Sequence, residues 1–252
     1  MNDFIKDSIK KKYSDIAISG NSDCCCMPGE CNTDDSPIDV TMIIGYDKKD
    51  INEIPQDAVL GIGCGAPLNH AKLQKGETVV DLGSGAGIDA FLSANKVTET
   101  GNVIGIDITD EMLEKSRKNA DDGNYFHVDF RKGDIEKNIP VDTRTIDVVI
   151  SNCVINLTTN KTGVFNEVYR ILKNNGRMVI SDLVTDKEIA PENIDPEKWS
   201  ACIDGAITKE NYIKCISNAG FLDIKILEER TYMEGDKVDG RKITSLVIKA
   251  IK

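Results

Sequence analysis

The chain has 252 residues, 40% of them hydrophobic, which is enough for one large domain or a domain with an appendage. Its formal charge of −11 at pH 7 repels phosphate backbones and anionic lipids, so we expect no nucleic-acid or membrane partner. Residues 1–12 are charged throughout and no apolar run approaches the ~18 residues of a membrane helix, so the sequence predicts a cytoplasmic protein without a signal peptide.

The N-terminal region, residues 1–72, is predicted to hold one helix and a cysteine-bearing loop. Residues 3–13 have the periodicity of a short charged helix. Residues 20–37 are rich in Ser, Asn, Asp, Gly and Pro, which is typical of a loop.

From Glu77 onward, short apolar runs alternate with stretches of helical periodicity, which predicts a parallel sheet covered by helices. The predicted strands are 78–82, 102–108, 125–131, 145–151 and 177–183. The predicted helices are 86–95, 110–120 and 163–172. We assign these elements to an α/β core over residues 73–190.

Residues 191–252 are predicted to close this core. The acidic segment 191–205 contains the only tryptophan, Trp199, and we interpret it as a cap or lid. A helix follows over 208–219, with Thr208 as its N-cap and Gly220 as its stop. Strands over 221–229 and 242–251 are expected to pair antiparallel beside the mostly parallel sheet.

A glycine-rich loop follows the first core strand and begins the next helix, which is the context of a nucleotide-binding turn. Gly83, Gly85 and Gly87 leave room for a cofactor against the backbone, and the helix N-terminus offers free N–H groups. Asp107 ends the next strand, where its carboxylate is placed to accept hydrogen bonds from ribose hydroxyls.

The identity of that cofactor follows from Asp81, which precedes the glycines. Its charge would oppose a pyrophosphate but suits the ammonium or sulfonium of a methionine moiety, so we favour S-adenosylmethionine. The spacing from Gly85 to Ala90 also fits a relaxed NAD pattern, and an empty structural loop is a third reading.

Three residues after later strands are further candidates for the cofactor site. Asp134 is placed to accept a hydrogen bond from the adenine amino group, with Ile135 beside it, and a strand-ending turn is the alternative. Asn152 is placed to present its backbone to the cofactor, with a turn or capping role as the alternative.

Eight cysteines are too few for a disulfide scaffold, and three of them stand in separate small-residue segments. These are Cys64 in 61–67, Cys153 in 151–157 and Cys202 in 200–206. Folding can bring them to one cleft, as a site for a soft, three-coordinate ion. Zinc is the alternative, but it usually takes four ligands, often in CxxC pairs, which these segments lack.

Together these segments resemble the class I methyltransferases that use S-adenosylmethionine, which implies a Rossmann-like fold. The three cysteine segments, in this order, are more specific and resemble the arsenite methyltransferases. The resemblance runs from about Tyr13 to the C-terminus and includes 107–113 and 177–182. It implies that Tyr13 covers the cofactor and that Met112 belongs to the cofactor site.

The resemblance also implies a detoxifying reaction on a small inorganic substrate. Arsenite would be held by the thiolates of Cys64, Cys153 and Cys202 and methylated directly, with Cys153 and Cys202 closest to the chemistry. A further cysteine is implied in redox turnover, together with a thiol reductant of the thioredoxin or glutathione type. For this catalytic role we favour Cys25, as the representative of Cys24 to Cys26, over Cys31.

Two other functions stay open. One is a methyltransferase for a small organic thiol or carboxylate, in which the cysteines would only pack, and the other is a noncatalytic metalloid-binding protein. We expect a monomer, and the number of methyl groups added is not fixed by the sequence.

Overall fold

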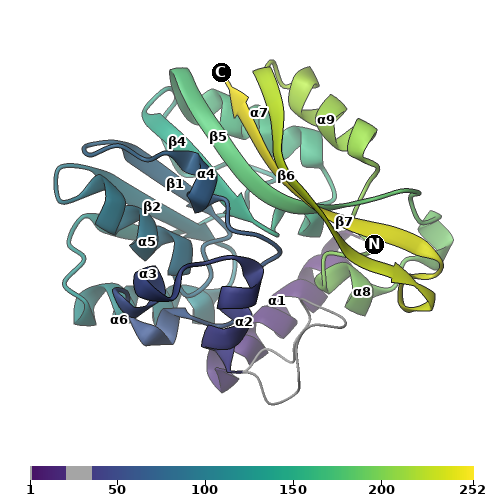
Figure 1. The fold of residues 1–252 in the computed structure, drawn as a ribbon, viewed down its shortest axis with the longest axis horizontal. Helices are drawn as coiled ribbons and strands as arrows, with labels where there is room; N and C mark the ends of the chain where they lie inside the picture. The colour runs from purple at the N-terminus through teal and green to yellow at the C-terminus, as the bar shows by residue number, and fades with distance from the viewer. Residues whose placement is uncertain (1, 21–35) are drawn as a thin grey trace.

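The computed structural model describes residues 2–20 and 36–252 (Figure 1). The cysteine-bearing loop predicted over 20–37 therefore falls almost entirely outside the described residues. The candidates for the redox cysteine lie there as well: Cys24, Cys25, Cys26 and Cys31.

A seven-stranded sheet forms the centre of the molecule, in the order β3-β2-β1-β4-β5-β7-β6 (Figure 1). The strands are β1 (Thr78–Leu82), β2 (Asn102–Asp107), β3 (Val128–Lys132), β4 (Ile146–Asn152), β5 (Leu172–Thr185), β6 (Leu222–Gly235) and β7 (Arg241–Ile251). The first five are parallel, and β7 runs antiparallel to both β5 and β6. The predicted α/β fold with a C-terminal antiparallel pair is confirmed.

The strand order places a crevice at one edge of this sheet. The chain leaves β1 toward β2 and β3 and then returns to pair β4 on the other side of β1, with Leu82 opposite Ser151. At such a reversal, loops from the carboxyl ends of adjacent strands diverge to opposite faces and leave room for a ligand. The segments that follow β1, β2 and β4 meet there.

Helices cover both faces of the sheet because successive strand residues point to opposite sides. The helices are α1 (Asn2–Ser19), α2 (Pro37–Ile44), α3 (Lys48–Asn52), α4 (Leu68–Ala71), α5 (Ile88–Val97), α6 (Asp110–Asp122), α7 (Lys161–Ile171), α8 (Pro196–Ser200) and α9 (Lys209–Asn218). Short 3-10 turns are η1 (Gln56–Ala58), η2 (Ile155–Leu157), η3 (Pro191–Asn193) and η4 (Asp236–Val238). Val79 packs with α5 and α6 on one face, whereas Val80 packs with α7 and α9 on the other.

Several elements differ from the predicted ones. Helix α1 continues to Ser19, six residues beyond the predicted end at Tyr13, because its later turns pack against α6. Helices α2 to α4 were not predicted, since each has eight residues or fewer and too few turns for a clear helical period. At α9 the prediction is confirmed: Thr208 accepts a hydrogen bond from Asn211 N–H at 3.3 Å, and Gly220 follows with φ of +101°.

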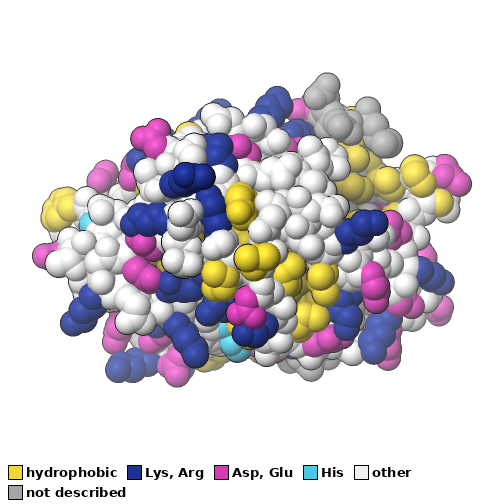
Figure 2. All heavy atoms as spheres, turned by 90° about the horizontal axis from the view of Figure 1, so that it is seen from above, with side chains coloured by type: hydrophobic (Ala, Val, Ile, Leu, Met, Phe, Trp, Pro, Cys, Tyr) yellow, Lys and Arg dark blue, Asp and Glu magenta, His cyan; other side chains and the backbone are white. Residues whose placement is uncertain are grey.

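The face of the molecule seen in Figure 2 carries charges of both signs. Seen from above, acidic and basic side chains are interspersed, and hydrophobic side chains gather near the centre of this face (Figure 2). Strand β6, at one edge of the sheet, leaves Leu222, Ile226 and Leu227 exposed. Within residues 2–20 and 36–252, no helix combines the length and apolarity needed to cross a bilayer.

Candidate functional site

A pocket lies over the carboxyl ends of β1, β2 and β4, and α1 covers it. The floor comes from the glycine-rich loop and from the residues that follow β2 and β4, and the roof comes from one face of α1. The lining includes Lys6, Ile9, Lys12, Tyr13, Asp81, Gly83, Gly85, Asp89, Asp107, Asp134, Ile135, Asn152, Cys153 and Cys202. Most of the candidate cofactor residues therefore share one pocket.

The glycine-rich loop adopts a conformation that needs its glycines. Gly83 has φ of +68°, and a Cβ there would lie 2.3 Å from Val154 Cγ2, so a side chain has neither the backbone angle nor the space. Asp107 fixes the far side of the loop, because its carboxylate accepts hydrogen bonds from Gly85 N–H at 2.9 Å and Thr109 N–H at 2.8 Å. Burial raises the pKa of Asp107, and these N–H donors oppose that rise.

The three candidate thiols meet beside this pocket, as the sequence predicted. Cys64 and Cys202 belong to one buried cluster, and Cys153 packs against it. The sulfurs of Cys64 and Cys153 lie within 4.8 Å of each other and of an Asp182 carboxylate oxygen. Cys202 Sγ–H donates to the Cys153 carbonyl at 2.9 Å. Hydrogen bonds with Cys202 and Cys64, together with burial, raise the pKa of the Cys153 thiol well above its usual value, so it holds its proton.

The loops that carry Cys153 and Cys202 lie in close contact. Both residues have positive φ, +58° and +63°, so each thiol projects from a sharp turn. Gly205 fits against the turn after Cys153 so closely that a Cβ on it would lie 1.9 Å from the Asn156 carbonyl oxygen. The glycine three residues after Cys202 is therefore what lets the two thiol loops touch.

The third thiol is positioned by Asn152, the last residue of β4. Its Oδ1 accepts a hydrogen bond from Cys64 N–H at 3.1 Å, and its Nδ2 donates to the Gly65 carbonyl at 2.7 Å and to Tyr46 Oη at 2.9 Å. The Asn152 side chain thus ties the Cys64 segment to the strand that ends at Cys153. This agrees with a structural role, and the residue also lines the pocket.

Sequence reasoning missed two buried carboxylates. Asp182 follows Ser181 at the end of the parallel part of β5, and its Oδ2 accepts hydrogen bonds from Asn156 N–H and Tyr212 Oη. Burial raises its pKa to about 6, although the charge of Lys161 opposes that rise. Asp89 lies in the first turn of α5. The sequence did offer a signal for both residues. Asp182 lies one position before the predicted strand end at residue 183, and Asp89 lies two positions after Gly87 of the glycine-rich loop.

The remaining candidates have different surroundings. Tyr13 is half-buried on α1 and lines the pocket, as does the buried Ile135. Met112 is only 1% exposed and packs with Ile16 and Ala86, beside the glycine loop and outside the pocket lining. Asp134 lines the pocket but already accepts a hydrogen bond from Lys6 Nζ at 2.8 Å.

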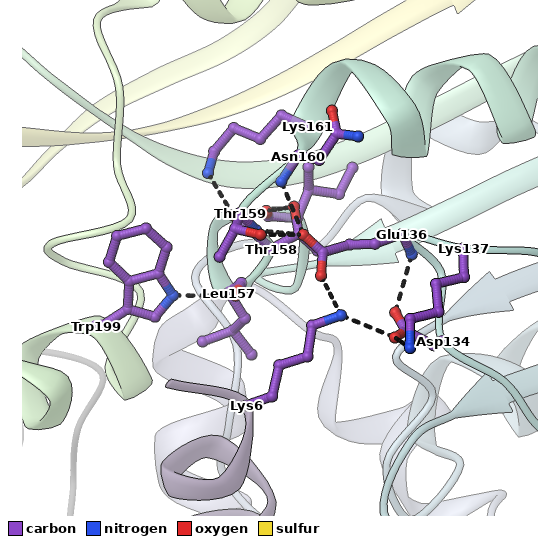
Figure 3. A network of polar contacts seen from close by, with 11 residues as sticks. Lys6, Asp134, Glu136, Lys137, Leu157, Thr158, Thr159, Asn160, Lys161 and Trp199 are labelled. Carbon is purple, nitrogen blue, oxygen red and sulfur yellow. Dashed lines mark hydrogen bonds and ion pairs between the residues drawn. The ribbon is translucent and has the colours of Figure 1, made fainter. Parts of the chain in front are cut away.

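Figure 3 shows Lys6 of α1 linked to Asp134 and Glu136, which follow β3, and this contact holds α1 over the pocket. Its ammonium bridges Asp134 and Glu136, and the Glu136 carboxylate also accepts hydrogen bonds from Thr159 and from Asn160 N–H. Burial raises the pKa of Glu136, but these hydrogen bonds outweigh it and lower the pKa overall. Close to this network, Trp199 donates a hydrogen bond from Nε1 to the Leu157 carbonyl at 3.0 Å.

Comparison with known proteins agrees with this geometry. Residues 73–220 match the family described as Methyltransferase domain. An arsenite methyltransferase of Halobacterium salinarum is 37% identical over 98% of this chain and 66% of its own length. The arsenite methyltransferase of Homo sapiens is 36% identical over 57% of this chain and 40% of its own length. The chain thus spans about two thirds of the first relative and less than half of the second.

A solved structure gives the same result. The X-ray structure of an arsenic(III) S-adenosylmethionine methyltransferase from Chlamydomonas reinhardtii superposes with a TM-score of 0.67 at 28% identity, covering 84% of this chain and 73% of that one. The chain therefore belongs to the class I methyltransferase family, in the group that contains the arsenite methyltransferases.

Proposed function

We propose that this protein methylates trivalent arsenic, held by the thiolates of Cys64, Cys153 and Cys202, with S-adenosylmethionine as the methyl donor. The observation that carries the proposal is the cluster of three thiols, two buried and one half-buried, at the side of a pocket built on the glycine-rich loop. Its relatives support the substrate, since they are named as arsenite methyltransferases.

The thiol cluster suits arsenite because trivalent arsenic is soft and three-coordinate. Each thiol proton leaves with one hydroxide of arsenite as water, so three cysteines replace three hydroxides without a separate base. The bound arsenic keeps a lone pair that can attack a carbon. The cluster has no paired CxxC segments, which distinguishes it from a common zinc site.

The pocket has the features that S-adenosylmethionine needs. Asp107 would accept hydrogen bonds from the ribose hydroxyls, Asp134 from the adenine amino group, and Gly83 would lie against the methionine moiety. The buried Asp81 Oδ2 has no hydrogen-bond partner within the described part of the chain, which suits a cationic ligand group. When bound, the cofactor supplies the methyl group and its sulfur keeps the bonding electron pair.

The chain's own residues would position arsenic against the cofactor and keep water away from the reacting atoms. Cys153 and Cys202 line the pocket while Cys64 lies behind them, so arsenic bound to all three would face the cofactor. Helix α1, with Tyr13 on its inner face, would exclude water from the reacting atoms. Methylation takes two electrons from arsenic, which two cysteine thiolates would return by forming a disulfide. A thiol reductant, with Cys25 or its neighbours, would reset the enzyme.

The experiment is a product assay. Purified protein is incubated with S-adenosylmethionine, arsenite and a dithiol, and the arsenic species are separated and identified by mass. Methylated arsenic is the expected product, with one S-adenosylhomocysteine formed for each methyl group found on arsenic. Binding of both ligands without any methylated arsenic would contradict the proposal and favour a noncatalytic metalloid-binding protein. Methyl transfer to the dithiol alone would favour the small-thiol methyltransferase.

Gly205→Ala tests the contact between the two thiol loops. The new Cβ would lie 1.9 Å from the Asn156 carbonyl, so the loops must separate and carry Cys202 away from Cys153. Because misplacement by about 1 Å costs about 100-fold in rate, we expect methylation to fall by about that factor. S-adenosylmethionine affinity, measured by calorimetry, should stay near that of the wild type. The glycine-rich loop that would bind the cofactor follows β1 and is a different segment from the one that carries Gly205. Unchanged arsenite methylation in a folded variant would contradict the role of this contact.

A further inference from the structure

Two buried carboxylates line the pocket: Asp81, which suits a cationic ligand group, and Asp89, to which the chemistry above gives no role. Asp81 is the last but one residue of β1 and Asp89 lies in the first turn of α5, and both line the pocket although they are only 2% and 3% exposed. Among the described residues, no ion pair joins either carboxylate to a lysine or arginine. Two neighbouring buried carboxylates without a cation are costly to ionise together.

The hydrogen-bonding groups around the two carboxylates are polar and uncharged where the structure describes them. Asp89 Oδ1 accepts a hydrogen bond from Tyr46 Oη at 2.7 Å, and Tyr46 is itself held by Asn152. Asp81 Oδ2 has no partner among the described residues. On β2, Asp107 adds a third carboxylate, which accepts hydrogen bonds from Gly85 N–H and Thr109 N–H.

The roof of the pocket carries the lysines. Lys6 and Lys12 of α1 both line it, and Lys6 is bound to Asp134 and Glu136. The glycine-rich loop lies between β1 and α5, so the carboxylate pair lies at the base of the loop where the methionine end of the proposed cofactor would rest. An ammonium group there would supply the missing cation.

We propose that Asp81 and Asp89 share one proton in the free enzyme and release it when the α-ammonium group of the cofactor binds to them. The proposal rests on the proposed use of S-adenosylmethionine and assigns Asp89 to its recognition. The ammonium nitrogen takes the place of the proton as the positive partner of the pair. No electron transfer is involved, and the proton passes to solvent.

The direction of the pKa values supports this pairing. Burial raises the pKa of Asp89 to about 6, although hydrogen bonds from Tyr46 and Asn152 oppose the rise. Burial also raises the pKa of Asp81 well above its usual range, and the charges of Asp89 and Asp107 raise it further. Because the two groups are neighbours, their proton belongs to the pair and not to one residue.

The affinity of the proposed ligand should therefore depend on pH. Below the pKa of the pair the proton must leave before the ammonium can bind, so the Kd falls about tenfold for each unit of rising pH and then levels off. A ligand without the ammonium group would leave the proton in place. S-adenosylhomocysteine and methylthioadenosine are the matched probes, since they share the adenosine and differ in the amino-acid end.

The test is calorimetry with the full-length protein at pH 6.0 to 7.5, in buffers of different ionisation enthalpy. S-adenosylhomocysteine should release up to about one proton, whereas methylthioadenosine should release almost none. Asp89→Asn, whose amide oxygen can still accept the Tyr46 hydrogen bond, should abolish most of the release and weaken S-adenosylhomocysteine at least tenfold. Asp110→Asn, an exposed carboxylate on α6, is the control and should keep the wild-type release.

The outcomes separate this proposal from the proposed function. If neither probe binds the wild type, the cofactor assignment itself fails. If S-adenosylhomocysteine binds without proton release, or Asp89→Asn releases as much as the wild type, the shared proton is overturned while the methyltransferase assignment stands. Should Asp89→Asn fail to fold, the wild-type pH profile still decides: equal pH dependence for the two probes would refute the pair.

Discussion

Replacing Cys202 with serine is expected to lower arsenite methylation by about 100-fold or more and to leave S-adenosylmethionine affinity nearly unchanged. A serine hydroxyl is a hard, protonated donor that does not replace a thiolate on trivalent arsenic. Cys202 belongs to the thiol cluster and lines the pocket, whereas the glycine-rich loop and Asp107 come from other segments. The same result is expected for Cys153→Ser, because the sulfur of Cys153 lies within 4.8 Å of the sulfur of Cys64.

The matched control is Cys215→Ser. Cys215 is a half-buried free cysteine on α9 that packs against a different hydrophobic cluster from the one that holds Cys64 and Cys202, and it does not line the pocket, so its thiol has no place in the proposed site. Methylation by this variant should stay within about twofold of the wild type after correction for any loss of stability. If Cys202→Ser were as active as Cys215→Ser, the proposed binding of arsenic by the thiol cluster would be wrong.

Asp107→Ala is expected to raise the Kd of S-adenosylmethionine by about 100-fold. The carboxylate holds Gly85 N–H and Thr109 N–H and would also receive the ribose, so the variant loses the loop anchor and the ligand contact together. Hydrogen bonds to a charged group contribute about 1.5–3 kcal/mol each, and about 3 kcal/mol corresponds to about 100-fold in affinity. Calorimetric titration measures the change.

Asp110→Ala serves as the control for that substitution. Its side chain is 70% exposed and pairs with Lys132 on the surface, three positions along the chain from Asp107. Surface ion pairs contribute little, so the Kd of this variant should equal that of the wild type within error. A similar Kd for Asp107→Ala and the wild type would show that the ribose is recognised elsewhere.

The core helices and strands could be predicted because the local sequence periodicity agrees with the topology of a parallel sheet. Strand β1 matches its predicted range of 78–82, and the glycine-rich loop after it occupies the expected crevice. The carboxyl ends of parallel strands lie at the same edge of the sheet, so the residues that follow β1, β2 and β4 are expected to lie close together. That rule also explains why Cys153, which follows β4, faces the cofactor pocket.

Other features depend on contacts between distant segments and had no local signal. Strand β6 extends to Gly235, beyond the predicted end at residue 229, because its later residues pair with the start of β7. The positive φ angles of Cys153 and Cys202 are set by the loops packed against them. The carboxylate pair of Asp81 and Asp89 needed coordinates as well, since a helix start and a strand end come together only through the turn between them.

Arsenic X-ray absorption spectroscopy of the protein with one equivalent of arsenite shows whether Cys64, Cys153 and Cys202 bind arsenic together. The four N-terminal cysteines, Cys24, Cys25, Cys26 and Cys31, are replaced by serine so that only the proposed site supplies closely grouped thiols. We expect three sulfur neighbours around arsenic, falling to two sulfurs and one oxygen in Cys64→Ser, Cys153→Ser and Cys202→Ser alike. Arsenic with fewer than three sulfurs before any of these replacements, or unchanged after them, would contradict it.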